Sequence, residues 1–200
     1  MRGRDKLLEE VDGVPLLRRQ AKVACEVGQS VLVLLPPDAG PRRDVLEGLR
    51  VRIATVDRAA EGISASIAVA TRYAGGTDGL AILLPDVPGV GSSEIRRVLD
   101  TYSMQRPTRT SDDSKSERFQ EVLQPVRATD PEGRPGTPIV LPPRLYPALE
   151  RLSGDAGARH ILRHEAVLDV PFADDRATRD LDTPEEWDAW RRERAIVRGN

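Results

Sequence analysis

Short apolar runs alternate with helical patterns through the first half of the chain, and this alternation constrains the fold more than any other feature. Val31–Leu35 and Leu80–Leu84 are continuous apolar runs, and Val51–Val56 is a more mixed one. Such runs are typical of strands buried on both faces of a parallel sheet. Helical patterns cover residues 15–27, 41–48, 64–74 and 92–102, with Ser64 and either Ser92 or Ser93 as the expected caps of the last two. The order predicts an α/β fold, a three-layer sandwich with a mostly parallel sheet.

The second half of the chain continues the fold without a repeat. Residues 121–142 predict two extended segments joined by a turn rich in Gly and Pro, followed by short helices near 144–152 and 156–164 and a strand at 166–170. In "DLDTPEEW", Thr183 is expected to cap a helix in which Pro184 is the first residue and Glu186 completes a capping box. We expect one domain over residues 1–200, with a flexible polar insert at 104–120.

The composition excludes several classes of protein. The 30 Lys and Arg residues nearly balance 32 Asp and Glu residues, so a strongly basic nucleic-acid binder is disfavoured. No apolar run approaches the ~20 residues of a membrane span or the ~7–15 residues of a signal peptide. Cys25 is the single cysteine, so no disulfide can form within the chain. These features predict a cytoplasmic protein of a reducing compartment.

Three carboxylates are candidate metal ligands. Asp86 follows the run Leu80–Leu84, and ligands of such folds bind outside the carboxyl ends of the strands. A carboxylate there suits Mg²⁺, although an aspartate between Pro85 and Pro88 is also an ordinary turn residue. Asp180 and Asp182 precede the capped C-terminal helix, where acidic residues also interact favourably with the helix dipole.

Lys6 and the segment "EGISAS" are further candidates for ligand binding. Lys6 could act as a point charge on a triphosphate, or it could be an ordinary solvated lysine. Gly62 permits close approach of a ligand, and Ser64 and Ser66 are small donors and acceptors against which a base or ribose could pack. The alternative is that Ser64 simply caps the following helix.

Six segments in order carry a family resemblance: "MRGRDKLLEEVDGVPLLRRQ", "EGISASI", "LLPDVPGV", "GRPGTPIVLPPRL", "LSGDAGARHIL" and "DLDTPEEW". Together they resemble the molybdopterin nucleotidyltransferase family, most closely its cytidylyltransferase branch, which makes molybdopterin cytosine dinucleotide from CTP. The resemblance implies a Rossmann-like nucleotidyltransferase fold. It also implies a reaction in which the cofactor phosphate attacks the α-phosphate of CTP, pyrophosphate leaves, and Mg²⁺ assists.

The resemblance also implies roles for the candidate residues. Lys6 matches a lysine that contacts phosphate, and Asp86 matches the acidic residue of the family's "ADMP" loop, which holds the metal. Asp180 and Asp182 match the segment "DIDTPED", in which an acidic residue completes the metal site. The loop with Ser64 looks more like the CTP type than the GTP type, and Ser66 lies in the same loop.

The chain departs from the family at its beginning. The family opens with an inner strand and a loop of the form "LAAGxSxRMGxxxK", and Met1 aligns with the methionine of that signature. Arg2 stands where glycine is common, and Thr137 replaces the histidine of "GHP". We therefore expect an interrupted sheet with unpaired backbone groups beside the interruption. A start codon assigned too late and a decayed, inactive copy both explain this, and the first is the simpler explanation.

Three functions follow from these observations. The first is an Mg²⁺-dependent cytidylyltransferase that acts on molybdopterin. The second is a non-catalytic module that holds molybdopterin or docks on a molybdoenzyme or its chaperone. The third is a nucleotidyltransferase for another phosphorylated acceptor.

Overall fold

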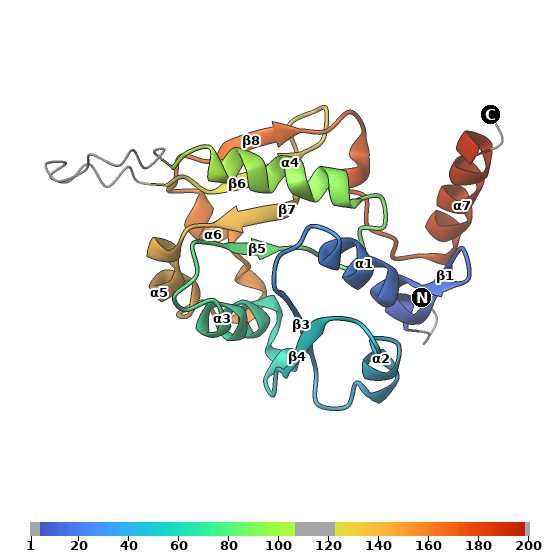
Figure 1. The fold of residues 1–200 in the computed structure, drawn as a ribbon, viewed down its shortest axis with the longest axis horizontal. Helices are drawn as coiled ribbons and strands as arrows, with labels where there is room; N and C mark the ends of the chain where they lie inside the picture. The colour runs from blue at the N-terminus through green and yellow to red at the C-terminus, as the bar shows by residue number, and fades with distance from the viewer. Residues whose placement is uncertain (1–4, 107–122, 199–200) are drawn as a thin grey trace, which may run out of the picture.

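A computed structural model describes residues 5–106 and 123–198, and Figure 1 shows their arrangement. The strands are β1 (Glu10–Val11), β2 (Val14–Pro15), β3 (Val31–Leu35), β4 (Val51–Thr55), β5 (Leu80–Ile82), β6 (Val126–Thr129), β7 (Pro135–Leu141) and β8 (Leu168–Pro171). They form an antiparallel hairpin of β1 and β2, a parallel pair of β3 and β4, and a four-stranded sheet in the order β5-β7-β6-β8. Residues 107–120 of the expected polar insert lie outside the described ranges.

The helices agree with the expected positions to within a few residues. The α-helices are α1 (Leu16–Cys25), α2 (Gly40–Asp44), α3 (Ile63–Tyr73), α4 (Ser92–Ser103), α5 (Tyr146–Leu149), α6 (Arg159–Leu162) and α7 (Pro184–Arg198). The short 3₁₀ turns are η1 (Lys6–Leu8), η2 (Ala59–Glu61), η3 (Pro143–Leu145), η4 (Gly154–Ala156) and η5 (Asp175–Ala177). Within the described ranges, no helix is long and apolar enough to cross a membrane.

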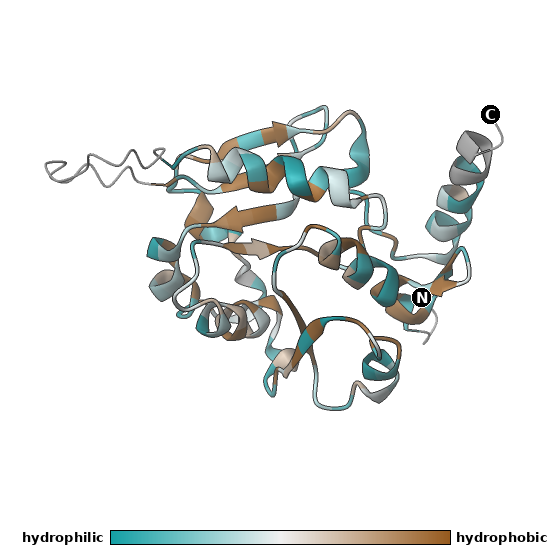
Figure 2. Ribbon diagram, viewed as in Figure 1, coloured by the Kyte–Doolittle hydropathy of each residue, from teal (hydrophilic) through white to brown (hydrophobic). Residues whose placement is uncertain are grey.

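The four-stranded sheet is the middle layer of three, as expected for this fold class. Ile139 and Leu141 of β7 pack against α3, α5 and α6 on one face. Val140 points to the opposite face and joins β6, β8 and α4. Neighbouring residues of a strand point to opposite faces, so β7 contributes to both cores. Figure 2 shows the apolar character of these strands between more polar helices.

The prediction of a mostly parallel sheet is wrong for the four-stranded sheet. β7 runs antiparallel to both β5 and β6, and only the β6–β8 pair is parallel. The expected hairpin explains this, because the tight turn after β6 reverses the chain into β7. The α/β fold class itself is confirmed, with a mixed sheet in place of a mostly parallel one.

The expected interruption of the sheet is present. Among the described strands, β3 pairs with β4 and β5 pairs with β7, and no ladder joins β3 to β5. Val31–Leu35 was expected to be buried on both faces, but its first four residues are only half-buried. A strand with one unpaired edge leaves that edge uncovered, which accounts for the incomplete burial.

The starts of the helices show which of the predicted caps are present in the structure. The capping box of α7 is confirmed: Glu186 N donates to Thr183 Oγ1 at 3.2 Å, and Thr183 N donates to Glu186 Oε2 at 2.8 Å. The expected serine caps are wrong, because α3 begins after Gly62 and α4 after Gly91. In α4 the Glu94 carboxylate accepts from Gly91 N at 3.1 Å, so no serine hydroxyl is needed there.

Candidate active site

Three of the predicted site residues meet at one point although they lie far apart in the sequence. Lys6 Nζ donates to Asp86 Oδ2 at 2.7 Å and to Asp182 Oδ1 at 2.5 Å. Lys6 and Asp86 are half-buried, whereas the Asp182 side chain is 59% exposed. We call these three residues the Lys6 cluster. It brings together the N-terminal segment, the loop after β5 and the segment before α7.

The turn η1 presents Lys6, and Asp5 fixes this turn. The Asp5 carboxylate caps η1 by accepting from Leu7 N at 3.1 Å. Arg42 of α2 donates to both oxygens of the same carboxylate, from Nε at 2.7 Å and Nη2 at 3.0 Å. Burial alone raises the pKa of Asp5, but the hydrogen bonds from Arg42 and Leu7 outweigh it and leave that pKa below its ordinary value. The chain next to Lys6 is therefore held by an ionised carboxylate.

The two aspartates of the cluster are joined through the backbone. Leu181 N donates to the carbonyl of Asp86 at 3.3 Å, and the Leu181 side chain is fully buried in the core around α1 and α7. The capping glutamate Glu186 also accepts from Asp182 N at 2.9 Å. These contacts hold the Asp182 backbone beside the loop that carries Asp86.

The electrostatics of the cluster favour a charged lysine. Partial burial lowers the pKa of Lys6, but hydrogen bonds to Asp182 and Asp86 and the charges of both carboxylates raise it above its ordinary value. Two carboxylates converge on one ammonium, which offsets only one of their two negative charges. The same pair of oxygens could neutralise a divalent cation.

The donor set fits Mg²⁺, and two of the three expected ligands lie together. Mg²⁺ in phosphate-transferring sites is bound by one or two protein carboxylates together with substrate phosphates and water. Asp86 and Asp182 supply two such carboxylates. Asp180 is exposed and lies outside the hydrogen bonds of Lys6. In the part of the chain that the structure describes, no third His, Cys, Asp or Glu side chain joins Asp86 and Asp182, so water or phosphate oxygens would complete the coordination.

The residues expected to select the nucleotide form a second group at the start of α3. Gly62 has a positive φ of 106°, and a Cβ there would lie 2.3 Å from Asp155 Oδ1, so glycine is required. The space beside Gly62 is thus filled by the segment "SGDAG". Ser64 is 2% exposed and Ser66 is half-buried. The structure thus brings the start of α3, in "EGISASI", next to η4, in "LSGDAGARHIL".

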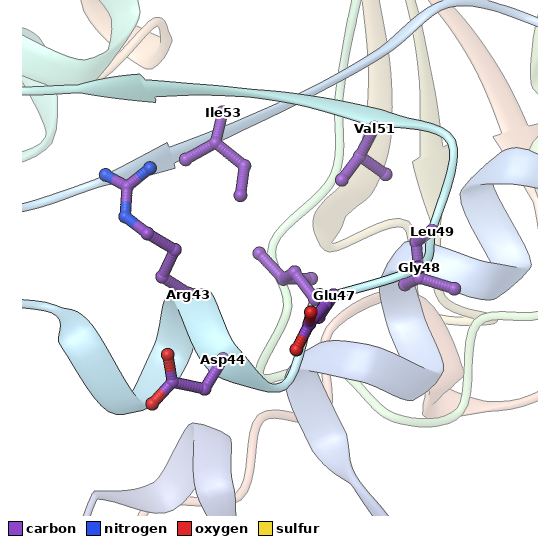
Figure 3. A pocket seen from close by; sticks show the side chains of 8 residues that line it. Arg43, Asp44, Glu47, Gly48, Leu49, Val51 and Ile53 are labelled. Carbon is purple, nitrogen blue, oxygen red and sulfur yellow. The ribbon is translucent and has the colours of Figure 1, made fainter.

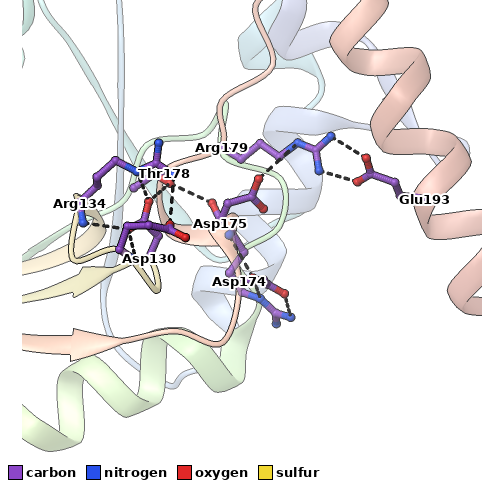
Figure 4. Close-up of polar contacts among 9 residues, drawn as sticks. Asp130, Arg134, Asp174, Asp175, Thr178, Arg179 and Glu193 are labelled. Atoms are coloured by element: carbon purple, nitrogen blue, oxygen red, sulfur yellow. Dashed lines mark hydrogen bonds and ion pairs between the residues drawn. The ribbon is translucent and has the colours of Figure 1, made fainter.

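A buried carboxylate lies at the β6–β7 turn, outside every predicted site. Asp130 accepts from Arg134 Nε at 2.6 Å, from Arg134 N at 2.8 Å and from Thr178 Oγ1 at 3.2 Å, as Figure 4 shows. We call these three residues the Asp130 cluster. Burial raises the pKa of Asp130, but hydrogen bonds from Arg134 and Thr178 outweigh it and leave that pKa below its ordinary value. This cluster ties the turn to the segment that leads to Asp182.

A shallow pocket of about 430 Å³ lies between α2 and β4, as Figure 3 shows. Leu49, Val51 and Ile53 form its apolar side, and Arg43 and Glu47 lie opposite. None of the predicted site residues lines this pocket. The candidate site is therefore the Lys6 cluster rather than this pocket.

A profile of the MobA-like NTP transferase domain matches residues 1–170. The chain belongs to the MobA-like NTP transferase family. The matched range includes the loop with Asp86 and the "GRPGTP" hairpin of this chain, whereas Asp182 lies beyond it. The expected nucleotidyltransferase resemblance is confirmed at this level. Comparison with curated protein sequences finds no match.

Solved structures support the same fold for this NTP transferase. Rv0371c from Mycobacterium tuberculosis superposes with a TM-score of 0.75 at 20% identity, over 95% of this chain and 90% of that one. Rv0371c has also been solved as a complex with manganese, with a TM-score of 0.71 at 19% identity over 92% and 89% of the two chains. The 4-diphosphocytidyl-2C-methyl-D-erythritol synthase of Anaerococcus prevotii gives 0.65 at 13% identity, over 94% and 92%. At these identities the likeness shows the fold.

The residues that hold the turn with Lys6 in this family member were not predicted from the sequence. Asp5 stands directly before the turn that carries Lys6, and an aspartate at that position is a recognisable cap signal. Nothing in the sequence indicated that Arg42 would contact Asp5, because "GPRRD" does not distinguish it from the exposed Arg43. Only the fold shows that Arg42 reaches Asp5.

Proposed function

We propose that this chain is a cytidylyltransferase that transfers CMP from CTP to molybdopterin and releases pyrophosphate, with Mg²⁺ as its metal. The observation that carries the proposal is the convergence of Lys6, Asp86 and Asp182 in a chain of the NTP transferase family. The choice of CTP and molybdopterin rests on the six segments that resemble the cytidylyltransferase branch.

The proposed reaction is a displacement at phosphorus. A phosphate oxygen of the acceptor forms a bond to the α-phosphorus of CTP. The bond from that phosphorus to the oxygen bridging to the β-phosphate breaks, and the electron pair leaves with pyrophosphate. Such a transfer depends mainly on positioning and on electrostatic stabilisation of the phosphate oxygens.

The chain's own residues would supply both the positioning and the electrostatic stabilisation. Asp86 and Asp182 would hold Mg²⁺, which when bound neutralises charge on the phosphate oxygens. Lys6 donates to both carboxylates in this structure, and its three N–H donors would serve phosphate oxygens when Mg²⁺ takes its place between the carboxylates. Its raised pKa keeps it charged at neutral pH. Asp5 and Arg42 would keep this ammonium in place.

The test combines nucleotide binding with product analysis. The full chain is titrated calorimetrically with MgCTP and MgGTP and is then incubated with CTP, Mg²⁺ and molybdopterin. We expect binding of CTP in preference to GTP, and molybdopterin cytosine dinucleotide formed in equal amount to pyrophosphate. The absence of heat at millimolar nucleotide, together with the absence of product, would contradict the proposal.

A different phosphorylated acceptor is the second candidate. The structural similarity to cytidylyltransferases that act on other acceptors favours it, since the fold accommodates more than one of them. The same assay separates the two candidates when a sugar or polyol phosphate replaces molybdopterin. Release of pyrophosphate with these acceptors, and none with molybdopterin, would favour the second candidate.

A further inference from the structure

A glutamine occupies the buried face of α1. Gln20 is 2% exposed and lies among Leu16, Leu17 and Ala21 on that face. Its Nε2 donates to the carbonyl of Val87 at 3.1 Å. Its Oε1 has no hydrogen-bond partner within the described residues. A buried acceptor without a partner destabilises a fold, so stability does not explain a glutamine at this position.

The atom that Gln20 holds belongs to the loop that carries Asp86. Three consecutive carbonyls of this loop accept hydrogen bonds from distant parts of the chain. The carbonyl of Asp86 accepts from Leu181 N at 3.3 Å, that of Val87 from Gln20, and that of Pro88 from Arg19 Nη1 at 2.7 Å. Pro85 and Pro88 have no N–H with which to anchor the loop. Within the loop, Val90 N donates to the Val87 carbonyl at 3.4 Å, and the three shorter bonds come from outside it.

Two of these donors are consecutive residues of one helix. Figure 1 shows α1 lying beside the chain that leaves β5. Arg19 reaches the loop from the partly exposed side of α1, whereas Gln20 reaches it from the buried side. Because the two side chains hold neighbouring carbonyls, they restrain both the position and the rotation of the peptide groups next to Asp86. Small displacements of a reacting group have large effects on catalysis.

We propose that Arg19 and Gln20 are positioning residues that keep the Asp86 carboxylate facing Lys6 and Asp182. The proposal rests on the proposed function, since it assigns these residues to the cation site of that function. It explains why α1 retains a polar side chain with an unpaired oxygen in its apolar face. The fold accepts an unfavourable burial in exchange for a fixed loop.

The decisive variant is Gln20→Leu, which keeps the volume and removes both polar atoms. Mn²⁺ alone is titrated into the full chain and followed by electron paramagnetic resonance, and the melting temperature is measured in parallel. We expect the variant to melt at the same temperature as the wild type or higher, while its Mn²⁺ affinity falls about tenfold. If Gln20 were merely structural, the variant would melt at a lower temperature and its Mn²⁺ affinity would be unchanged.

Arg19 and Arg18 provide a matched pair of controls on the same helix. Arg18 Nη1 also donates to backbone carbonyls, those of Val45 at 2.7 Å and Glu47 at 2.9 Å, but in the chain that follows α2. We expect Arg19→Met to weaken Mn²⁺ binding and Arg18→Met to leave it at the wild-type value. This pair carries the test if Gln20→Leu does not fold.

The outcomes separate this proposal from the proposed function. Wild-type binding of Mn²⁺ with equal affinity in Gln20→Leu and Arg19→Met overturns the positioning role and leaves the proposed function intact. A lower melting temperature with unchanged Mn²⁺ affinity also overturns it. Absence of Mn²⁺ binding by the wild type at millimolar metal contradicts the cation site of the proposed function, and the positioning role falls with it.

Discussion

Asp86 and Asp130 are both aspartates in loops that follow strands, yet their surroundings differ completely. The Asp130 side chain is fully buried and accepts from two backbone N–H groups, from the guanidinium of Arg134 and from Thr178. The Asp86 side chain is 23% exposed and accepts from the ammonium of Lys6. A carboxylate whose lone pairs are taken by fixed donors holds the fold together. A carboxylate such as that of Asp86, whose partner is one partly exposed ammonium, can exchange that cation for a ligand.

The two clusters are nevertheless connected along the chain. Thr178 of the Asp130 cluster is followed within a few residues by Leu181, which donates to the Asp86 carbonyl, and by Asp182 of the Lys6 cluster. The Asp130 cluster thus fixes the segment that carries Asp182 of the Lys6 cluster. The comparison predicts that variants of the two clusters affect different measurements.

The largest expected effect is the loss of catalytic activity in Asp86→Asn. Loss of a metal-binding carboxylate is expected to lower the rate of CMP transfer by about 10²-fold or more. The melting temperature should change by no more than about 2 °C, because a partly exposed ion pair contributes little to stability. Asp169→Asn is the matched control, since Asp169 forms an ion pair of 2.7 Å with Arg127 away from the site. Equal losses of activity in both variants would contradict the comparison.

The second effect is on nucleotide affinity in Lys6→Met. Removal of a charged donor is expected to raise the KM for CTP about tenfold or more, because charge-assisted hydrogen bonds to phosphate are lost. The affinity for Mn²⁺ alone should not fall, since both carboxylates remain and their competing cation is gone. Steady-state kinetics and a metal titration measure the two quantities. A drop in Mn²⁺ affinity with an unchanged KM would assign Lys6 to the fold instead.

The third effect is on stability in Asp130→Ala. The backbone N–H groups of Glu132 and Arg134 lose their acceptor, and we expect the melting temperature to fall by about 5 °C. Calorimetry measures this change, and activity per folded molecule should stay within about threefold of the wild type. A large loss of activity without a loss of stability would place Asp130 in the catalytic machinery and break the comparison.

The smallest effect is on the acid limb of stability. The pKa of Asp130 is lower in the folded chain than its unfolded value of about 3.9, so its contribution is fully present above that pH. The contribution is lost as the pH falls through the lower, folded pKa. Unfolding by denaturant between pH 6 and pH 2, roughly the range in which carboxylates protonate, should show a flatter acid limb in Asp130→Asn than in the wild type. Parallel limbs would contradict the assignment.

Local signals in the sequence predicted most elements of this fold. The capping box around Thr183 and Glu186 is made of neighbours in the chain, so its geometry follows from spacing alone. The serine caps failed because α3 and α4 begin directly after Gly62 and Gly91, which places the serines inside the helices. The strand directions failed where one hairpin reversed β7, since a strand's apolar pattern does not reveal its direction.

The candidate site depends on contacts between distant segments. Family resemblance predicted Lys6, Asp86, Asp180 and Asp182, and the structure brings Lys6, Asp86 and Asp182 together. Leu181, between Asp180 and Asp182, is buried and donates to the Asp86 carbonyl, while Asp182 turns toward Lys6. The roles of Arg42, Gln20 and Asp130 depend on partners that only the folded chain brings near.

The most direct test of the central claim is the position of the metal. Crystals of the full chain are soaked with Mn²⁺ and CTP, and an anomalous difference map locates the manganese. We predict a peak bound by the carboxylates of Asp86 and Asp182 and by phosphate oxygens, with Lys6 at the triphosphate. Manganese and nucleotide bound elsewhere, with Lys6 still between the two carboxylates, would contradict the account.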